Sequence, residues 1–157
     1  MDWIIVGAAM LALSHMVWTD FKFRHIHAIT LLLFTAATIA ELWLHHQLTS
    51  QLWLQYLLNV SYTVLALSSG ALILHLIRKI SFREMIGKGD LLLLLPACFW
   101  FEIVHYLVWF NVSLVLMAIS HLILSNLRRM SRKEGVPMAG YLSLTMIIYL
   151  FLRPSFS

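Results

Sequence analysis

Two aspartates are the residues of this chain whose type and placement could do chemistry together. Asp20 closes the first apolar run in WTDFKFRHIH, and Asp90 precedes five leucines in GKGDLLLLLP. Two carboxylates at one membrane depth can hydrolyse a peptide bond, because one takes a proton from water while the other, protonated, donates to the scissile carbonyl. Partial burial and mutual repulsion would separate their proton affinities, so that the pair titrates as a unit.

The surroundings of Asp90 allow a catalytic and a structural interpretation. Gly87 and Gly89 can adopt positive φ and permit close approach of a substrate backbone. Asp90 would also stand at or near a helix N-cap, where free backbone N–H groups favour an ionised carboxylate. Asp is a common N-cap, and the four-residue pattern GxGD is short, so a purely structural capping role stays open.

The composition decides the class of protein. Of 157 residues, 61% are hydrophobic and only 11% are charged, and the mean hydropathy is +0.86. A soluble domain of this size cannot bury so much apolar side chain, which predicts a polytopic membrane protein. The first run is expected to be a retained helix rather than a signal peptide, since Asp2 replaces a basic n-region. Cys98 is the single cysteine, which excludes a disulfide framework and a cysteine-rich zinc site.

The apolar runs predict an all-α fold of about six transmembrane helices in one domain, residues 1–157. The fourth run has eleven residues and covers about half of a ~30 Å hydrocarbon core. It is either a short helix or one that continues to about Tyr106 and carries Glu102. The predicted spans are Trp3 to Thr19, Ala28 to His45, Leu52 to Ile77, Leu91 to Phe101, Ile103 to Leu127 and Val136 to Leu152.

The basic residues predict the orientation. Ten of the eleven lie in alternate loops, and Arg153 is the exception. The positive-inside rule therefore places these loops in the cytoplasm and both termini outside. Asp20 and Asp90 fall at the cytoplasmic rim, and Glu41 and Glu102 at the opposite rim. The basic clusters suit contact with anionic lipid, and their distribution argues against nucleic-acid binding. They are Lys22 and Arg24; Arg78, Lys79, Arg83 and Lys88; and Arg128, Arg129, Arg132 and Lys133.

Other residues have structural explanations at this stage. An aromatic belt at the outer boundary accounts for Trp43, Trp53, Trp100, Tyr106 and Trp109. Gly70 and Gly140 are expected to permit close helix packing, and Pro137 to begin the last helix.

The eight histidines give no metal-ligand pattern. His25 and His27 lie in the loop after Asp20 and could meet the substrate, but interfacial loop residues are the simpler interpretation. His15 stands five residues before Asp20, a poor match to one helical face. His75 and His121 lie just inside their spans and remain candidates, whereas His45 and His46 have no suitable partners.

Three stretches together resemble the type IV prepilin peptidases and, more distantly, the presenilin-type intramembrane aspartyl proteases. GKGD resembles the GxGD motif of these families. Asp20, followed by Lys22, Arg24 and Ile26, is similar to the first aspartate motif of prepilin peptidases, and VPMAGYLSL, residues 136–144, is similar to the start of their last helix. His27, Ala28 and Leu92 depart from the family pattern, which has Pro-Asn after the Ile and Lys two residues beyond the second aspartate.

The resemblance implies a peptidase that removes the short basic leader of a prepilin or pilin-like, single-span substrate at the cytoplasmic face of the bacterial inner membrane. Asp20 and Asp90 would be the catalytic pair, and a second copy of the chain is a further candidate partner. The chain resembles the compact peptidase-only branch, for which we expect no cofactor and no metal. Gly87, Lys88, Gly89, Lys22, Arg24, Val136 and Pro137 would line the active-site loops.

Two alternatives remain at this stage. One is an intramembrane protease of the same chemistry with a different single-span substrate. The other is a catalytically silent scaffold or small transporter, in which the aspartates are helix caps or ion ligands. A transporter would more naturally place its acids near the bilayer midplane.

Overall fold

The computed structural model describes residues 3–23, 25–44, 49–78, 87–126 and 138–152. Within these ranges the chain is all α-helical, as the sequence predicted, and contains no strand. The six helices are α1 (Trp3–Phe23), α2 (Ala28–Leu44), α3 (Ser50–Arg78), α5 (Lys88–Ala97), α6 (Ile103–Asn126) and α7 (Met138–Leu152). Their centres agree with the six apolar runs.

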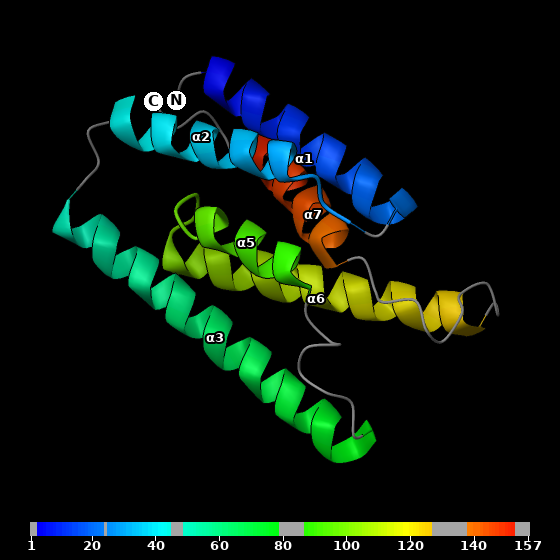
Figure 1. Ribbon diagram of the computed structural model, residues 1–157. Coiled ribbons are helices and arrows are strands. Elements are labelled where there is room, and N and C mark those ends of the chain that lie inside the picture. The colour runs from blue at the N-terminus through cyan, green and yellow to red at the C-terminus, as the bar shows by residue number, and fades with distance from the viewer. Residues whose placement is uncertain (1–2, 24, 45–48, 79–86, 127–137, 153–157) are drawn as a thin grey trace.

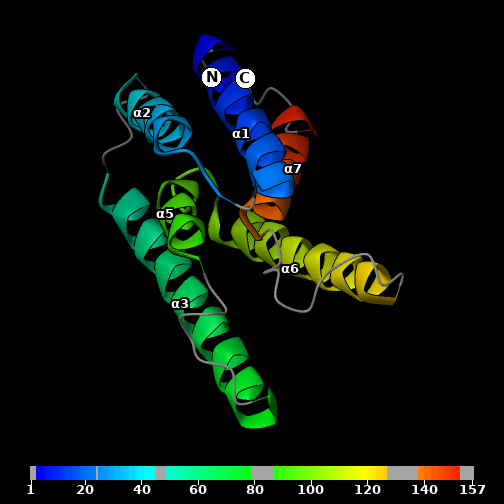
Figure 2. The same ribbon diagram turned by 45° about the vertical axis from the view of Figure 1, so that its right-hand side comes forward.

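Helix α1 packs closely against α7 and α2, and α7 also packs against α6 (Figure 1). Helices α1 and α7 run antiparallel, so that the end of α1 meets the beginning of α7. The short helix α5 lies in the middle of the molecule, between α2 and α7 on one side and α3 on the other (Figure 2). This arrangement brings the end of α1 and the beginnings of α5 and α7 to one end of the bundle.

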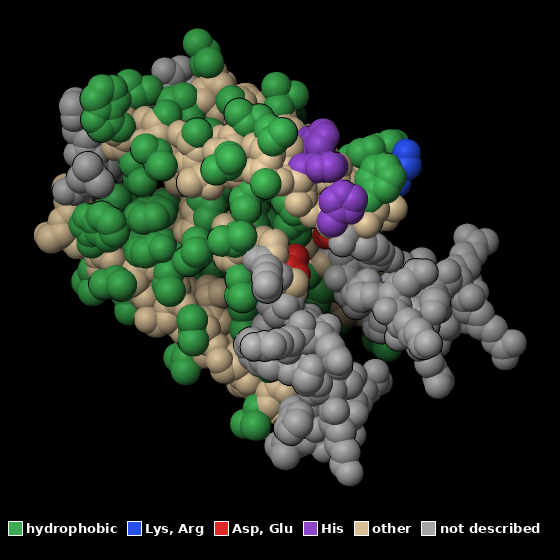
Figure 3. Space-filling model, in the orientation of Figure 1, with side chains coloured by type: hydrophobic (Ala, Val, Ile, Leu, Met, Phe, Trp, Pro, Cys, Tyr) green, Lys and Arg blue, Asp and Glu red, His purple; other side chains and the backbone are tan. Residues whose placement is uncertain are grey.

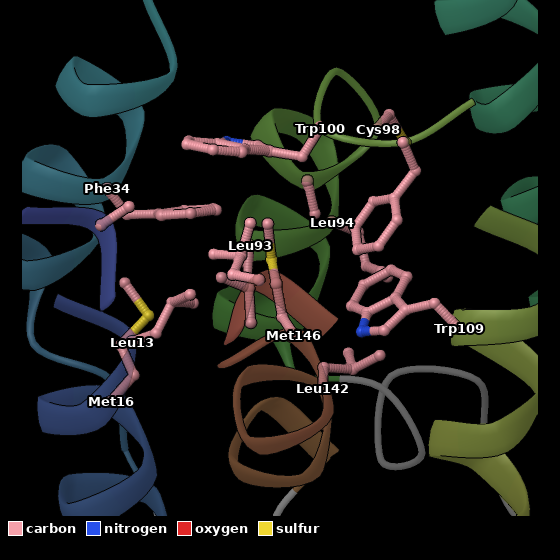
Figure 4. Packing of buried hydrophobic residues seen from close by; sticks show 14 of the residues in the cluster. Leu13, Met16, Phe34, Leu93, Leu94, Cys98, Trp100, Trp109, Leu142 and Met146 are labelled. Carbon is pink, nitrogen blue, oxygen red and sulfur yellow. The ribbon is translucent and has the colours of Figure 1, made fainter. Parts of the chain in front are cut away.

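The core forms around α5. Leu93 and Leu94 are almost completely buried and face side chains from α1, α2, α6 and α7. Figure 4 shows Leu93 beside Phe34, and Met146 of α7 beneath it. Burying large apolar side chains of this kind contributes about 1.5–3 kcal/mol each relative to exposure. The core therefore fixes the position of α5, and with it the position of Asp90.

The structure resolves the two possibilities for the fourth apolar run in favour of the short helix. The regular backbone of α5 ends at Ala97, immediately after Pro96. A turn follows, in which the Trp100 N–H donates to the Ala97 carbonyl, and α6 begins at Ile103. Pro96 removes one backbone donor, which favours an end at this point. Ten residues at about 1.5 Å per residue give a helix of roughly 15 Å.

The predicted aromatic belt is wrong for three of its five residues. Trp100, Tyr106 and Trp109 are buried in the core, where the Trp100 Nε1–H donates to Thr38 Oγ1 at 2.7 Å. Trp43 and Trp53 are exposed, as an interfacial position would require. The turn between α5 and α6 folds back over the bundle, and it thereby encloses rings that a straight span would leave at its boundary.

Two helices of the described chain are long and apolar enough to cross a membrane. They are α1 and the segment Ile103–Ser120 of α6, judged by length and composition alone. Helices α2 and α7 are apolar but shorter.

Candidate active site

Asp20 ends the buried face of α1. The residues of this face recur every three or four positions: Val6, Ala9, Leu13, Met16 and Asp20. This is the spacing of one side of a helix, so the same packing that buries Met16 also turns Asp20 inwards. Asp20 is 6% exposed, and its Oδ2 accepts a hydrogen bond from the Gly140 N–H at 2.6 Å.

Asp90 lies in the first turn of α5, with both carboxylate oxygens hydrogen-bonded. Oδ2 accepts from the Gly87 N–H at 3.0 Å, and Oδ1 accepts from the Ala139 N–H at 2.9 Å. Gly87 is the N-cap of α5, two residues before Gly89 and three before Asp90. Asp90 therefore closes the first turn from inside the helix, which refines the expectation that it would stand at or near the N-cap.

The two carboxylates meet on the first turn of α7. Ala139 and Gly140 are consecutive residues, and consecutive Cα atoms are about 3.8 Å apart, so the two acceptor oxygens lie in one small region. The first N–H groups of a helix have no partner within it and carry the positive end of the helix dipole. Helix α7 thus holds two acids from distant parts of the sequence side by side.

This arrangement changes the proton affinity of Asp90, which lies just before the predicted span Leu91 to Phe101. Partial burial and, second, the charge of Asp20 raise the pKa of Asp90 from 3.8 to about 6. The hydrogen bonds from Gly87 and Ala139 act in the opposite direction and lower it. Desolvation and a neighbouring carboxylate both disfavour the charged form. Asp90 therefore keeps its proton up to about pH 6, where an ordinary aspartate would already be ionised.

Close approach, rather than positive φ, explains the glycines at the site. Gly87 has a φ of −68°, and Gly89 lies within α5, so the expectation of a positive φ at these positions is wrong. A Cβ at Gly140 would lie 2.7 Å from the Phe21 ring and 3.2 Å from Asp20 Oδ2. A Cβ at Gly87 would lie 2.9 Å from Asp90 Oδ2. The groups that come close to these two glycines are carboxylates and an aromatic ring of the chain itself.

Gly89 links two of the sequence motifs. A Cβ at this position would lie 3.0 Å from Ile26 Cδ1, so Ile26 of the first motif packs directly on the GKGD turn. Gly70, by contrast, has no atom within 4 Å of a Cβ added there, and the prediction that it permits close packing is wrong. The same prediction for Gly140 is confirmed.

The remaining predicted site residues are only partly described. Lys22 is exposed, and its Nζ lies 5.0 Å from the Trp18 ring and 5.1 Å from the Phe23 ring. Lys88 begins α5, but its side chain is outside the described part of the structure. Also outside are Arg24, Val136 and Pro137, the histidines at 45 and 46, and the side chains of His75 and His121.

Sequence reasoning missed a grouping of histidines at this end of the molecule. The ring centroids of His15 and His27 are 5.7 Å apart, and those of His25 and His27 are 4.9 Å apart. Figure 3 shows histidine side chains gathered on the face where acidic side-chain atoms reach the surface. The spacing of His15 from Asp20 gave no sign of this grouping, because its neighbour His27 comes from the segment that immediately precedes α2. Among the described residues, no three His, Cys, Asp or Glu side chains are grouped so that they could hold a metal ion.

The arrangement places two carboxylates side by side and raises the pKa of one of them, which is what general acid–base hydrolysis would require. The family resemblance implies that the backbone from Val136 to Gly140 lies near the aspartates, and within this segment the N–H groups of Ala139 and Gly140 donate to Asp90 and Asp20. Comparisons with protein-family models, with curated proteins and with solved structures find no match to this chain.

Proposed function

We propose that the chain is a membrane-embedded aspartic peptidase that removes the basic leader of prepilin-like, single-span substrates. One observation carries the proposal: carboxylates from α1 and α5 meet on consecutive N–H groups of α7. Two acids from separate helices, one of them with a pKa raised to about 6, satisfy the requirement for a coupled acid and base.

In the proposed reaction Asp20 is the base and Asp90 the acid. Asp20 removes a proton from water, and the hydroxide equivalent adds to the carbonyl carbon of the scissile peptide bond. Asp90 gives its proton to the carbonyl oxygen. The tetrahedral intermediate then collapses, the C–N bond breaks, and the leaving amine takes a proton from the Asp20 carboxyl group. One hydroxyl of the intermediate becomes the carbonyl of the new carboxylic acid and returns its proton to Asp90, which restores the starting state of the pair. The α7 amides hold both carboxylates in position throughout.

The membrane setting is part of the proposal. The six helices would form about six spans in the bacterial inner membrane, with both termini outside and the aspartates at the cytoplasmic face. Supporting this, large apolar side chains are exposed on all six helices, and hydrophobic residues cover much of the face shown in Figure 3. Soluble monomers rarely expose apolar patches of more than a few hundred Å². The substrate's basic leader would remain at the cytoplasmic surface.

A second candidate function has a specific observation in its favour. Each aspartate accepts a hydrogen bond from an N–H in the first turn of α7, and a helix cap requires no more than this. The chain would then be a catalytically silent membrane scaffold. A transporter is less well supported, since the aspartates lie at helix ends rather than midway along them.

Replacement of each aspartate by asparagine distinguishes the two candidates. The asparagine carbonyl can still accept one N–H hydrogen bond, so folding should persist, whereas the ionisable group is lost. We expect Asp20→Asn and Asp90→Asn to reduce leader cleavage of a co-expressed pilin-like substrate by about 10²–10⁴-fold. Glu102→Gln, at the opposite end of the bundle, is the matched control and should cleave normally. If either aspartate variant cleaved at the wild-type rate, the peptidase proposal would be wrong and the scaffold interpretation would remain.

A further inference from the structure

An apolar cavity separates α3 from α5. Its volume is about 190 Å³, and among the described residues its lining comes from these two helices and from Cys98, the C-cap of α5. On α3 the lining residues recur every three or four positions from Val60 to Ser68, and on α5 they do so from Leu91 to Cys98. Each wall is therefore one face of a helix. No lining residue is charged.

The cavity is closed at one end by polar contacts between α3 and the turn after α5. Asn59 Nδ2 donates to the carbonyl oxygens of Cys98 at 2.9 Å and Phe101 at 3.0 Å. The Tyr56 ring stacks on Phe99 with a centroid distance of 3.9 Å, and Thr63 Oγ1 lies 2.6 Å from the Tyr106 hydroxyl. These contacts hold α3 near its middle, at the end of α5 that is remote from Asp90.

The other end of the cavity reaches the proposed active site. Leu91, which lines the cavity, directly follows Asp90 in the first turn of α5. Val64 and Leu95 line it too and are 56% and 45% exposed, so the groove is open along its length. Figure 2 shows α3 extending past α5 beyond the region of these contacts. A groove of about two helical turns thus extends from Leu91, the residue next to Asp90, towards the end of α5.

We infer that this groove receives the apolar helix of the substrate, on the C-terminal side of the cleaved bond. The inference rests on the proposed function. An apolar helix docks through side chains at positions i, i+3, i+4 and i+7, and both walls present complementary rows with this spacing. The substrate chain would leave the groove at Leu91 and pass Asp90 and Asp20 in an extended form. Its basic leader would then lie outside the groove, which offers no charged partner.

The size of the cavity limits what enters it. An apolar cavity of about 150 Å³ accommodates a benzene molecule, so a space of about 190 Å³ holds one large apolar side chain rather than a whole helix. The substrate helix would lie along the mouth of the groove with one such side chain inserted between α3 and α5. Binding should therefore depend on the free volume of the groove.

The first test fills the groove and measures cleavage kinetics. Val64→Trp places a large ring in the mouth, and Leu65→Trp is the matched control, since Leu65 is the next residue, is 70% exposed and does not line the cavity. The probe is a synthetic peptide with a basic leader and one apolar helix. We expect Val64→Trp to raise KM roughly tenfold or more with kcat little changed, the size of effect that small changes in apolar pockets produce. Equal KM values for the two variants would contradict the inference.

The second test detects binding without catalysis. Cys98 is the only cysteine, so a Cys98→Ala chain carrying Asp20→Asn and Asp90→Asn accepts single reporter cysteines. Leu95→Cys lies in the groove, and Leu92→Cys, 51% exposed and outside it, is the control. The probe peptide carries a cysteine at each of three successive helix positions in turn. We expect disulfide cross-links to Leu95→Cys to exceed those to Leu92→Cys at one or more of these positions.

The two tests separate failure of this inference from failure of the proposed function. If the wild-type chain does not cleave the probe but Leu95→Cys still cross-links it, the groove stands and the peptidase function falls. If the wild-type chain cleaves but neither test distinguishes groove from control, the groove inference falls. A photoreactive phospholipid that labels the groove and is not displaced by the peptide would make it a lipid site and also overturn the inference.

Discussion

Helices α7 and α3 are held in the molecule in different ways. Nine of the fifteen residues of α7 are buried, most of them apolar, and its first turn is bound by both aspartates. The buried residues of α3, within its described side chains, are Asn59, Thr63 and Ala71. Helix α3 is thus held mainly by polar contacts at a few points, and α7 by continuous packing.

In the proposed function this difference would correspond to two tasks. A catalytic pair requires its carboxylates to stay within fractions of an ångström of a productive geometry, and α7 supplies that rigidity. A wall of the inferred groove must leave space for an inserted apolar side chain, and α3 can do so because few of its described residues are buried. The glycines of the two helices differ in the same way. A Cβ added at Gly140 would contact neighbouring side chains, whereas a Cβ added at Gly70 would have no neighbouring atom within 4 Å.

The largest effect is expected where packing is tightest. In Gly140→Ala the new Cβ would lie 2.7 Å from the Phe21 ring and 3.2 Å from Asp20 Oδ2. Overpacking of this kind costs about 1–3 kcal/mol of stability. A displaced carboxylate should lower the cleavage rate about a hundredfold, as small misplacements at active sites do. Thermal unfolding and leader cleavage measure the two effects, and wild-type activity in Gly140→Ala would show that α7 tolerates movement.

The next effect is a dependence of stability on pH. The pKa of Asp90 in the folded chain, about 6, lies above its ordinary value of 3.8. Between these values the folded chain binds more protons than the unfolded chain, so this group makes stability fall as pH rises. The loss should reach at most about 3 kcal/mol, since a tenfold change in proton affinity corresponds to about 1.4 kcal/mol.

Thermal unfolding of the wild-type chain and of Asp90→Asn in detergent, from pH 4 to 7, measures this effect. The variant should lose less stability than the wild type over the interval. Parallel curves for the two proteins would show that Asp90 does not titrate there.

A smaller effect is expected from loosening α3. Asn59→Leu removes the hydrogen bonds to the Cys98 and Phe101 carbonyls, but Gln55 Nε2 also donates to Phe101 at 3.2 Å. The substitution also removes the buried Asn59 Oδ1, which has no hydrogen-bond partner. We therefore expect a net loss of only about 1 kcal/mol. Chemical denaturation measures it, and a loss as large as that of Gly140→Ala would mean that α3 is as firmly held as α7.

The smallest effect is expected at the second glycine. Gly70→Ala adds a methyl group to open space on α3. Alanine is favoured over glycine within a helix by up to about 1 kcal/mol, so stability should stay level or rise slightly. Leader cleavage should be unchanged. The pair Gly140→Ala and Gly70→Ala makes the same chemical change in the two regions, and equal losses in both would contradict the contrast between them.

Much of the fold could be predicted because helix formation is a local property here. Apolar runs bounded by charged loops gave the positions of the six helices. The fourth run was compatible with a short helix and with a longer one, and the structure decides for the short helix α5. The aspartates could be assigned to the same end of the bundle, because α1 ends at one charged loop and α5 begins at another. That Asp20 faces inwards could not be predicted in this way, because α1 is apolar on all sides and its exposed Leu11 and Trp18 are as apolar as its buried Leu13 and Met16.

Only the tertiary structure decided which groups complete the site. The sequence does not show that the N–H groups of Ala139 and Gly140 receive the two carboxylates, because that depends on how α7 crosses α1 and α5. The same is true of Trp100, whose burial follows from the fold of the turn after α5, and of the contrast between Gly70 and Gly140. Periodicity and hydropathy describe one helix at a time, whereas burial, close approach and the pKa of Asp90 arise where helices meet.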